Sequence, residues 1–419
     1  MTKFYELSRE ARLKQLLNAE VLDEMQYKIL LANQQIPAEI ANNMVENQLT
    51  QYAIPEGLVR NMLINNQVYQ IPLVTEEPSV IAAANYAAKL STNNGGFHVE
   101  AHRDGLLGQV VFADINDLEQ KAQMIKDHAV EIKDAADAAY PSIVNRGGGL
   151  KKQTVTIVAE RFLKLTLLVD TKAAMGANMV NEISEKVGQL LTPMIGQPPL
   201  MAILSNHAPQ DVTTATVRLA VDTLTTPTLA GLEVAKRIVQ ASAFAHADFE
   251  RAVTHNKGIM NGINAVVTAY GNDTRAIASA AHAFAAQSGN YQPLSSWVLE
   301  GQFLVGQLQV PLPIGAVGGS IGIVPMARTN QEFARAKDPV IMQQQIAAVG
   351  LASNLAALRA LVTDGIQKGH MNLQFKALAM QAGAKGTEIP WLQHKLKVEK
   401  HANLEIAQRL LAEKRKGNL

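Results

Sequence analysis

The chain has 419 residues, of which 47% are apolar and 18% are charged, and its formal net charge is +1. This composition is typical of a soluble globular protein with a large core and two or three domains, and it gives no sign of nucleic-acid binding. Because cysteine is absent, disulfides, cysteine-ligated metals and enzymes that work through an acyl-cysteine are excluded.

The N-terminus carries no apolar signal region, and no uncharged apolar run reaches the roughly 18 residues of a membrane span. The segment that comes closest, Ile346 to Leu358, is rich in alanine and contains Ser353 and Asn354. We interpret it as a buried helix. A cytoplasmic protein without a membrane segment is therefore expected.

The first hundred residues predict helices, then a strand, then a helix. Residues 8–60 are expected to be mostly helical, and alternating apolar residues over 66–75 predict a strand. Glu77 follows this strand and precedes an alanine-rich helix expected over 80–90. From spacing alone, Glu77 is interpreted as a carboxylate at a helix N-terminus, where it meets the helix dipole.

Residues 108–206 carry the clearest pattern in the chain. Apolar runs and helical periodicity predict strand, helix, strand, strand, helix and strand in that order, which is the ferredoxin-like motif. The expected elements are a strand over 108–115, one helix over 118–136, a hairpin of 154–159 with 162–169, a helix over 180–190 and a strand over 200–204.

A glycine-rich loop, Arg146-Gly147-Gly148-Gly149, lies inside this unit. It is either an ordinary turn or a place where backbone amides approach a phosphate, and the following Lys151 and Lys152 favour the second interpretation. No Gly-x-Gly-x-x-Gly, Walker loop or His-Glu-x-x-His helix is present, so neither a Rossmann site nor a bound metal is expected.

The second half of the chain predicts mixed elements with two unusual charged positions. A strand is expected over 213–221, helices over 229–249, 274–287 and 338–363, and an amphipathic basic helix over 390–419. Lys257 and Asp273 flank an apolar segment. Buried charges are costly unless they are paired, so these two are predicted to form one polarised site. His370, between Gly369 and Met371, is either a loop residue or a proton donor near neutral pH.

Together these segments resemble one enzyme family. Glu76-Glu77-Pro78-Ser79, His255-Asn256-Lys257-Gly258, Gly271-Asn272-Asp273 and Gly369-His370-Met371 are similar to the signature segments of 3-hydroxy-3-methylglutaryl-coenzyme A (HMG-CoA) reductase of the soluble bacterial (class II) type. Further matches are Met44-Val45-Glu46-Asn47, Asn94-Gly95-Gly96-Phe97, Ala174-Met175-Gly176-Ala177-Asn178, Leu204-Ser205-Asn206 and Gly315-Ala316-Val317-Gly318-Gly319.

The resemblance implies a four-electron reduction of HMG-CoA to mevalonate and CoA by two nicotinamide hydrides, in the mevalonate pathway of isoprenoid synthesis. It implies four catalytic residues: Glu77, Lys257, Asp273 and His370. Lys257 would stabilise the oxyanion, and Asp273 would keep Lys257 protonated. Glu77 would serve as general acid, and His370 would protonate the departing CoA thiolate.

Substrate and cofactor residues also follow from the resemblance. The substrate contacts are Ser79, Arg251, Asn261 and Asn206, with Arg251 holding the free carboxylate of the hydroxymethylglutaryl group. The cofactor contacts are Tyr140, Arg146, Lys152, Met175, Gly176 and Asn178.

The implied fold is α+β. A large mixed α/β substrate domain (1–103 and 208–365) carries an inserted ferredoxin-like cofactor domain (104–207) and a C-terminal helical flap (366–419). The resemblance further implies a homodimer with its active sites at the subunit interface, and it leaves higher assembly open.

Three positions depart from the family pattern. Ala173 stands where an aspartate is usual, and Thr50 where a glycine is usual. Near Tyr140 there is no acidic residue of the kind that binds ribose hydroxyls in NADH-preferring relatives, so NADPH is expected, with NADH as the alternative. Two other interpretations stay open: a catabolic enzyme that oxidises mevalonate with NAD⁺, and a non-catalytic acyl-CoA-binding homologue.

Overall fold

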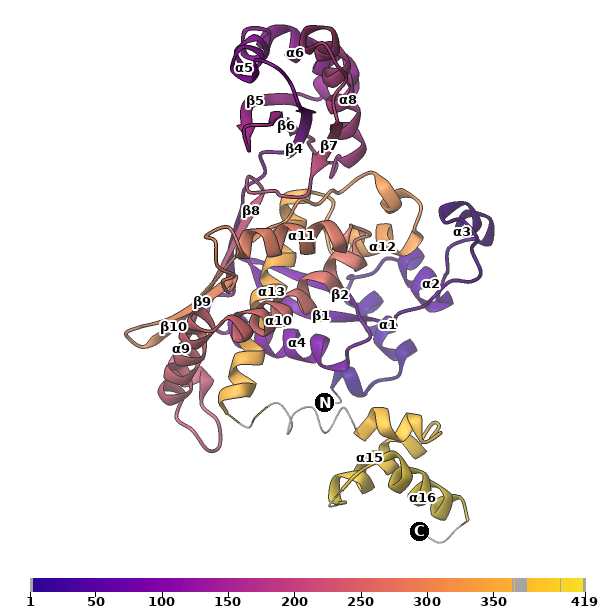
Figure 1. Cartoon of the computed structure of the whole chain (residues 1–419). Coiled ribbons are helices and arrows are strands. Elements are labelled where there is room, and N and C mark those ends of the chain that lie inside the picture. Colours follow the sequence, from indigo (N-terminus) through magenta and orange to yellow (C-terminus); the bar gives the residue numbers. More distant parts are fainter. Residues whose placement is uncertain (1–2, 364, 366–374, 400, 417–419) are drawn as a thin grey trace.

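The protein is a mixed α+β structure built on two β-sheets (Figure 1). The computed structural model describes residues 3–363, 365, 375–399 and 401–416. Each sheet has its own hydrophobic core, and a third, smaller core joins the C-terminal helices.

The larger sheet has six strands in the order β2-β1-β3-β8-β10-β9. All neighbouring pairs are antiparallel except β1 and β3. Its strands are β1 (Glu56–Ile64), β2 (Gln67–Val74), β3 (Phe97–Ala101), β8 (Val212–Ala220), β9 (Ser295–Glu300) and β10 (Phe303–Pro311). The prediction that residues 8–60 are mostly helical is wrong beyond Met44, where α3 (Ala38–Met44) ends and an irregular segment leads into β1. The predicted strands over 66–75 and 213–221 are confirmed as β2 and β8.

Helices pack against this sheet and against one another. They are α4 (Pro78–Thr92), α9 (Gly231–Ala247), α10 (Phe249–Ala269), α11 (Thr274–Ala285), α12 (Pro325–Phe333) and α13 (Pro339–Val362), with the short turns η2 (Val221–Leu224) and η3 (Gly319–Gly322). Helix α13 packs against α4, α9 and α10 and against strands β3, β8 and β10. It is long and apolar enough to cross a membrane, yet 67% of its most apolar window is buried inside the protein. The predicted buried helix is thereby confirmed.

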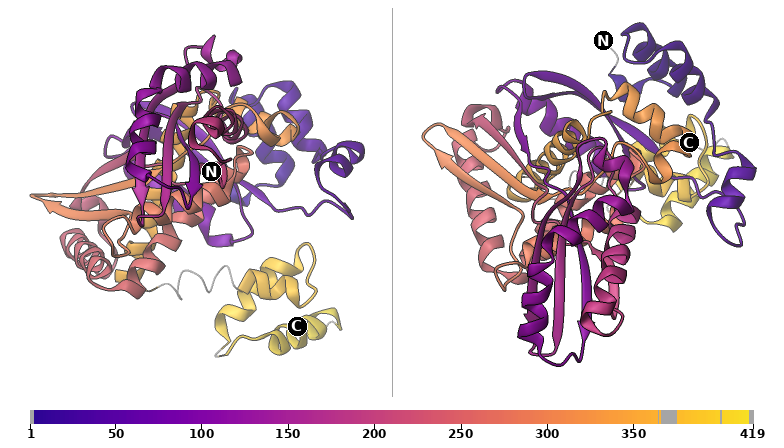
Figure 2. Two further views of the ribbon diagram at one scale, coloured as in Figure 1. Left: turned by 45° about the horizontal axis from the view of Figure 1, so that its top comes forward. Right: turned by 90° about the horizontal axis from the view of Figure 1, so that it is seen from above.

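The smaller sheet has four strands in the order β5-β6-β4-β7. Its elements are β4 (Leu106–Ala113), α5 (Leu118–Asp127), α6 (Ala129–Ala139), α7 (Pro141–Val144), β5 (Gly149–Val158), β6 (Phe162–Asp170), α8 (Ala177–Ile195) and β7 (Met201–Ser205). The predicted β-α-β-β-α-β order is present. The single helix predicted over 118–136 is wrong, because the chain leaves helical geometry at His128 and starts α6 there. Figure 2 shows this unit projecting from the rest of the molecule.

Short helical elements lie at both ends of the chain. The N-terminal ones are η1 (Phe4–Glu6), α1 (Arg9–Asn18), α2 (Glu24–Ala32) and α3 (Ala38–Met44). Near the C-terminus, a helical segment over 375–381, α15 (Glu388–Val398) and α16 (Leu404–Arg415) bury Leu392, Leu396 and Leu411 against one another. The single basic helix predicted over 390–419 is wrong, since two helices occupy it. Residues 366–374 of the predicted flap lie outside the described residues.

Candidate active site

Helix α10 presents Arg251, Lys257 and Asn261 on one face. Asp248 caps its N-terminus by accepting a hydrogen bond of 2.7 Å from the backbone nitrogen of Arg251. At about 100° per residue, the three side chains fall within an arc of roughly 120°. Lys257 is exposed, whereas Arg251 and Asn261 are partly buried. The prediction that these residues act together is thus compatible with one helix face.

The side of α10 that faces away from Lys257 is fixed by a buried polar network. His255 Nε2 lies 2.6 Å from Ser295 Oγ and 3.0 Å from Asn354 Nδ2, and Trp297 Nε1 donates to Asn354 Oδ1 at 2.7 Å. Burial lowers the pKa of His255 to about 4, so the imidazole is neutral at pH 7. The network therefore sets the rotation of α10 and the direction in which Lys257 projects.

Asp273 is the N-cap of α11, not the partner of Lys257. Its carboxylate accepts hydrogen bonds from the backbone nitrogens of Arg275 and Ala276 and pairs with the Arg275 guanidinium at 2.7 Å. Lys257 is exposed and forms no ion pair with any residue that the structure describes. Within a single chain, Lys257 and Asp273 thus form no ion pair with each other, and their joint role stays a prediction.

The geometry of α10 explains this separation. Twelve residues lie between Lys257 and the end of the helix at Ala269, and at 1.5 Å per residue they span about 18 Å. Asp273 follows only four residues later, beyond the left-handed turn at Gly271. Lys257 thus lies near the middle of α10, and Asp273 lies beyond its C-terminal end.

Glu77 and Ser79 lie together at the start of α4. Glu77 is the N-cap of this helix, which confirms the position predicted for it. Its Oε1 accepts a hydrogen bond of 2.8 Å from Ser79 Oγ, and its backbone nitrogen donates to Thr75 Oγ1 at 3.1 Å. Two residues predicted for different roles are thus in direct contact.

Most of the predicted cofactor residues gather at one end of the four-stranded sheet. Gly149 at the start of β5 pairs with Asp170 at the end of β6. A side chain at Gly148 would stand 2.6 Å from the carbonyl oxygen of Asp170, so only glycine allows this close approach. The glycine-rich loop therefore runs beside the segment that leads into α8.

The side chains at this end differ in their surroundings. Gly176 caps α8 in the left-handed conformation, with φ of 95°, and Met175 and Tyr140 pack against the core of the smaller sheet. Arg146, Lys152 and Asn178 are exposed. Within the described part of the chain, neither Arg146 nor Lys152 has an ion-pair partner, whereas Lys151 pairs with Asp104 at 3.2 Å. Asn206 is exposed just after β7.

Backbone contacts connect this end to the neighbourhood of Asp273. Ala316 N donates to Ala173 O at 2.8 Å, and Asn272 binds both the nitrogen and the carbonyl of Gly315. These contacts were not predicted from the sequence, because no periodicity relates residues so far apart. Ala173 is held here through its main chain, which requires no carboxylate.

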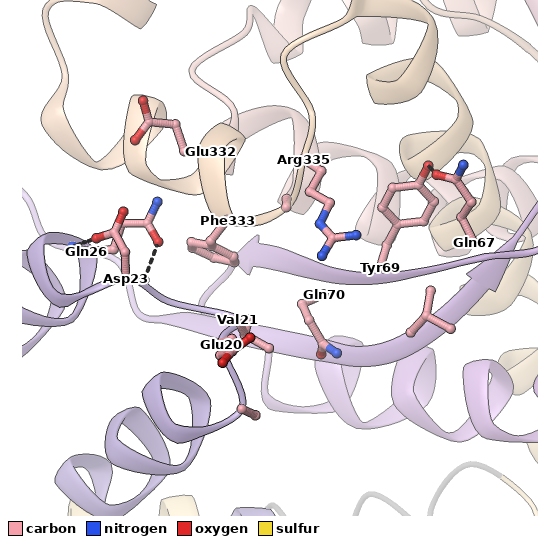
Figure 3. A pocket seen from close by; sticks show the side chains of 13 residues that line it. Glu20, Val21, Asp23, Gln26, Gln67, Tyr69, Gln70, Glu332, Phe333 and Arg335 are labelled. Atoms are coloured by element: carbon pink, nitrogen blue, oxygen red, sulfur yellow. Dashed lines mark hydrogen bonds between the residues drawn. The ribbon is translucent and has the colours of Figure 1, made fainter.

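Two cavities among the described residues lie away from most of these side chains. One, of about 650 Å³, lies between the α1–α2 turn, β2 and the end of α12, and is lined by Glu20, Tyr69 and Arg335 among others (Figure 3). No predicted site residue lines it. The other, of about 600 Å³, lies between α3 and η3, where Ser320 Oγ donates to Gly271 O at 3.0 Å.

One predicted catalytic residue cannot be placed, since His370 lies outside the described residues. Among those that are described, no group of three or more His, Asp or Glu side chains could hold a metal ion.

Comparison with known proteins points to one family. The family model described as hydroxymethylglutaryl-coenzyme A reductase matches residues 8–375. A 3-hydroxy-3-methylglutaryl-coenzyme A reductase from Archaeoglobus fulgidus is 38% identical over 391 residues, which are 92% of this chain and 88% of that protein. A probable reductase of the same name from Borreliella burgdorferi is 35% identical over 89% of this chain and 86% of its own.

Solved structures agree with the sequence matches. The 3-hydroxy-3-methylglutaryl-coenzyme A reductase from Streptococcus pneumoniae is 41% identical, with a TM-score of 0.84 over 98% of both chains. The class II enzyme from the same organism, bound to NADPH in open conformations, is 41% identical, with a TM-score of 0.83 over 98% of this chain and 100% of that one. The chain belongs to the hydroxymethylglutaryl-coenzyme A reductase family.

Proposed function

We propose that this protein reduces HMG-CoA to mevalonate and CoA with two molecules of NADPH, as the reductase of a mevalonate pathway. The family match over residues 8–375 carries this proposal. The chemistry needs no covalent acyl-enzyme, which agrees with a chain that has no cysteine.

Four residues carry the chemistry in this proposal. Hydride attack on the thioester, and later on the aldehyde, builds negative charge on the carbonyl oxygen, which Lys257 stabilises. Asp273 keeps Lys257 protonated, and Glu77 donates a proton as general acid. His370 protonates the CoA thiolate when the hemithioacetal collapses.

The substrate lies along α10 and the start of α4. Arg251 binds the free carboxylate of the hydroxymethylglutaryl group through a two-point ion pair. Arg251 is partly buried, and this burial lowers the pKa of its guanidinium. Because burial disfavours an unpaired charge, a carboxylate partner is favoured at this position. Asn261 lies four residues beyond Lys257 on the same face. Ser79 and Asn206 complete the substrate contacts.

NADPH binds at the end of the four-stranded sheet, where it supplies the hydride. Met175, Gly176 and Asn178 form the start of α8, and the free backbone amides of a helix N-terminus favour a phosphate group. Tyr140 lies nearby against the same core. The exposed cations Arg146 and Lys152 suit the 2′-phosphate that distinguishes NADPH from NADH. A relative 41% identical to this chain is described as bound to NADPH.

The active site forms between two copies of the chain. Lys257 lies near the middle of α10 and Asp273 lies beyond its C-terminal end, about 18 Å of helix away, yet the mechanism requires them in contact. A homodimer with two-fold symmetry brings the ends of paired elements together. Exposed apolar residues beyond α3, such as Leu49 and Tyr52 at 95% and 90% exposure, are consistent with a surface that another chain covers.

We assign the large domain to residues 1–103 and 208–365, the inserted ferredoxin-like cofactor domain to 104–207 and the flap to 366–419. The strand order β5-β6-β4-β7 supports the second assignment. The proposed enzyme acts in the cytoplasm and binds neither membrane nor nucleic acid.

Oxidation of NADPH, followed at 340 nm on addition of HMG-CoA, tests the proposal. We expect turnover with NADPH and a lower kcat/KM with NADH. Faster mevalonate oxidation with NAD⁺ than HMG-CoA reduction with NADPH would indicate the catabolic enzyme. No reaction with either cofactor would indicate a non-catalytic homologue.

A further inference from the structure

Arg103 lies where the chain passes from the six-stranded sheet to the four-stranded sheet, between β3 and β4. Its side chain is 13% exposed. Nε donates to the carbonyl of Lys172 at 2.9 Å, and Nη2 donates to that of Ala174 at 2.6 Å. Nη1 donates to the carbonyl of Ile314 at 2.6 Å. One rigid guanidinium thus joins the loop over 171–176 to the loop over 312–317.

Asp211 holds this guanidinium from the other crossing between the sheets, which runs from β7 to β8. Its side chain is 2% exposed, and its Oδ2 lies 3.9 Å from Arg103 Nη1. Its Oδ1 accepts hydrogen bonds from the backbone nitrogens of Asp104 at 3.0 Å and Gly105 at 3.1 Å. Because a buried charge is tolerated only when it is paired and hydrogen-bonded, this arrangement is fixed by the fold.

The two joined loops lead to the residue before Asp273. Asn272 donates to Gly315 O at 2.9 Å and accepts from Gly315 N at 2.8 Å. A side chain at Gly315 would stand 2.3 Å from the backbone nitrogen of Met175, so the loops meet without a gap. A chain of contacts therefore runs from Arg103 through Gly315 and Asn272 to Asp273.

We propose that Arg103 is a positioning residue that fixes the loop over 171–176 against the loop over 312–317, and thereby sets the distance from a bound nicotinamide ring to Asp273. The proposal rests on the proposed function, which places bound NADPH at this end of the four-stranded sheet, beside Met175 and Asn178. Besides Asp211 and a 3.5 Å hydrogen bond from Nη2 to Thr171 Oγ1, the guanidinium binds main-chain carbonyls, so Arg103 acts through the loops. A displacement of about 1 Å at a reacting centre can cost about 100-fold in rate.

The test compares Arg103→Ala and Arg103→Lys with a matched control, Arg161→Ala. Arg161 is an arginine of the same sheet unit, but it is 60% exposed and pairs with Asp114 at a hairpin turn. The measurements are kcat, KM for NADPH, and the deuterium isotope effect with NADPH deuterated at the transferred position. Hydrogen exchange of peptides covering 171–176 and 312–317 provides a readout that does not depend on activity.

For Arg103→Ala we expect kcat to fall by about 100-fold with a change of less than about fivefold in KM, and the isotope effect to rise. Exchange should accelerate in both loops, and millimolar guanidinium should restore part of kcat. Arg103→Lys keeps the charge but cannot bind three carbonyls together. Its kcat and its exchange rates should therefore lie between those of Arg103→Ala and those of the unmodified protein. Arg161→Ala should behave as the unmodified protein.

Unchanged exchange in both loops, or a kcat equal to that of the control, would overturn the proposal. If the unmodified protein reduces no HMG-CoA, the proposed function fails, and the exchange data still decide whether Arg103 holds the loops together. If Arg103→Ala does not fold, Asp211→Asn carries the same comparison, since it keeps an acceptor for the Asp104 and Gly105 amides and removes the charge.

Discussion

At the scale of single residues, the site consists of charged groups that the fold holds in different ways. Glu77 and Asp273 both cap helices, so the backbone of each fixes its carboxylate. Lys257 has no such restraint within the described residues and projects from the exposed face of α10. In the proposed homodimer, the side chain that carries most of the proposed chemistry is therefore expected to be held by the partner chain.

Replacing Lys257 with alanine should abolish reduction of both HMG-CoA and free mevaldehyde. Both steps build an oxyanion, and the loss of its stabilising cation is expected to cost at least about 100-fold in kcat. NADPH oxidation with each substrate measures this. Lys236→Ala, which removes an exposed lysine of the neighbouring helix α9, is the matched control. Retention of mevaldehyde reduction by Lys257→Ala would contradict the assigned role.

Replacing His370 with alanine should instead separate the two substrates. Only the thioester step expels a thiolate that needs a proton, so HMG-CoA reduction should fall by at least about tenfold more than mevaldehyde reduction. The same two assays measure this ratio. Equal losses on both substrates would argue against thiolate protonation by His370.

At the scale of elements, α10 joins a reactive face to a buried polar face. The network of His255, Ser295 and Asn354 lies directly behind Lys257 and ties the helix to β9 and α13. It contains a histidine whose neutral form is favoured by burial. The stability of the folded protein should therefore depend on pH through His255, which takes no part in the proposed chemistry.

The expected response follows from the lowered pKa of His255, about 4 in the folded protein against 6.5 for the unperturbed group. The stabilisation by neutral His255 is fully present above pH 6.5 and is lost as the pH falls toward 4, because the unfolded chain then binds the proton more readily. In denaturant titrations, the stability difference between the unmodified protein and His255→Asn should shrink by about 3 kcal/mol from pH 7 to pH 4.

Thr254→Asn is the control for this titration, since Thr254 is exposed on the same helix and its side chain carries no ionisable group. Its stability difference from the unmodified protein should stay nearly constant over the same range. A constant difference for His255→Asn as well would show that His255 does not titrate with a lowered pKa.

The elements that could be predicted from the sequence were those with local signals. The hairpin of β5 and β6 and the buried helix α13 follow from alternation and from apolar length. The break between α5 and α6 at His128 could not be predicted, because neither glycine nor proline occurs there. Likewise, no local pattern relates Arg103 to Ile314, 211 positions away. Long-range contacts of polar side chains with main-chain groups depend on how the sheets are packed, which periodicity does not report.

At the scale of the whole molecule, the separation of Lys257 from Asp273 makes the proposed activity a property of the proposed homodimer. A Lys257→Ala chain and an Asp273→Ala chain should each be inactive alone. A mixed dimer, isolated after co-expression of the two chains with different affinity tags, should contain one intact site of two and show about half of the unmodified activity. A steady-state assay of the isolated mixed dimer measures this, and an inactive mixed dimer would contradict a shared site.

Helix α13 affects what happens to the protein when it unfolds. It is apolar over nearly its whole circumference, with residues from Met342 to Leu358 almost entirely buried. When the protein opens, this helix loses the cover of both the sheet and its neighbouring helices, and exposed apolar segments of unfolded chains aggregate. Heat inactivation should therefore be irreversible, and the working lifetime of the enzyme should be governed by its rate of unfolding.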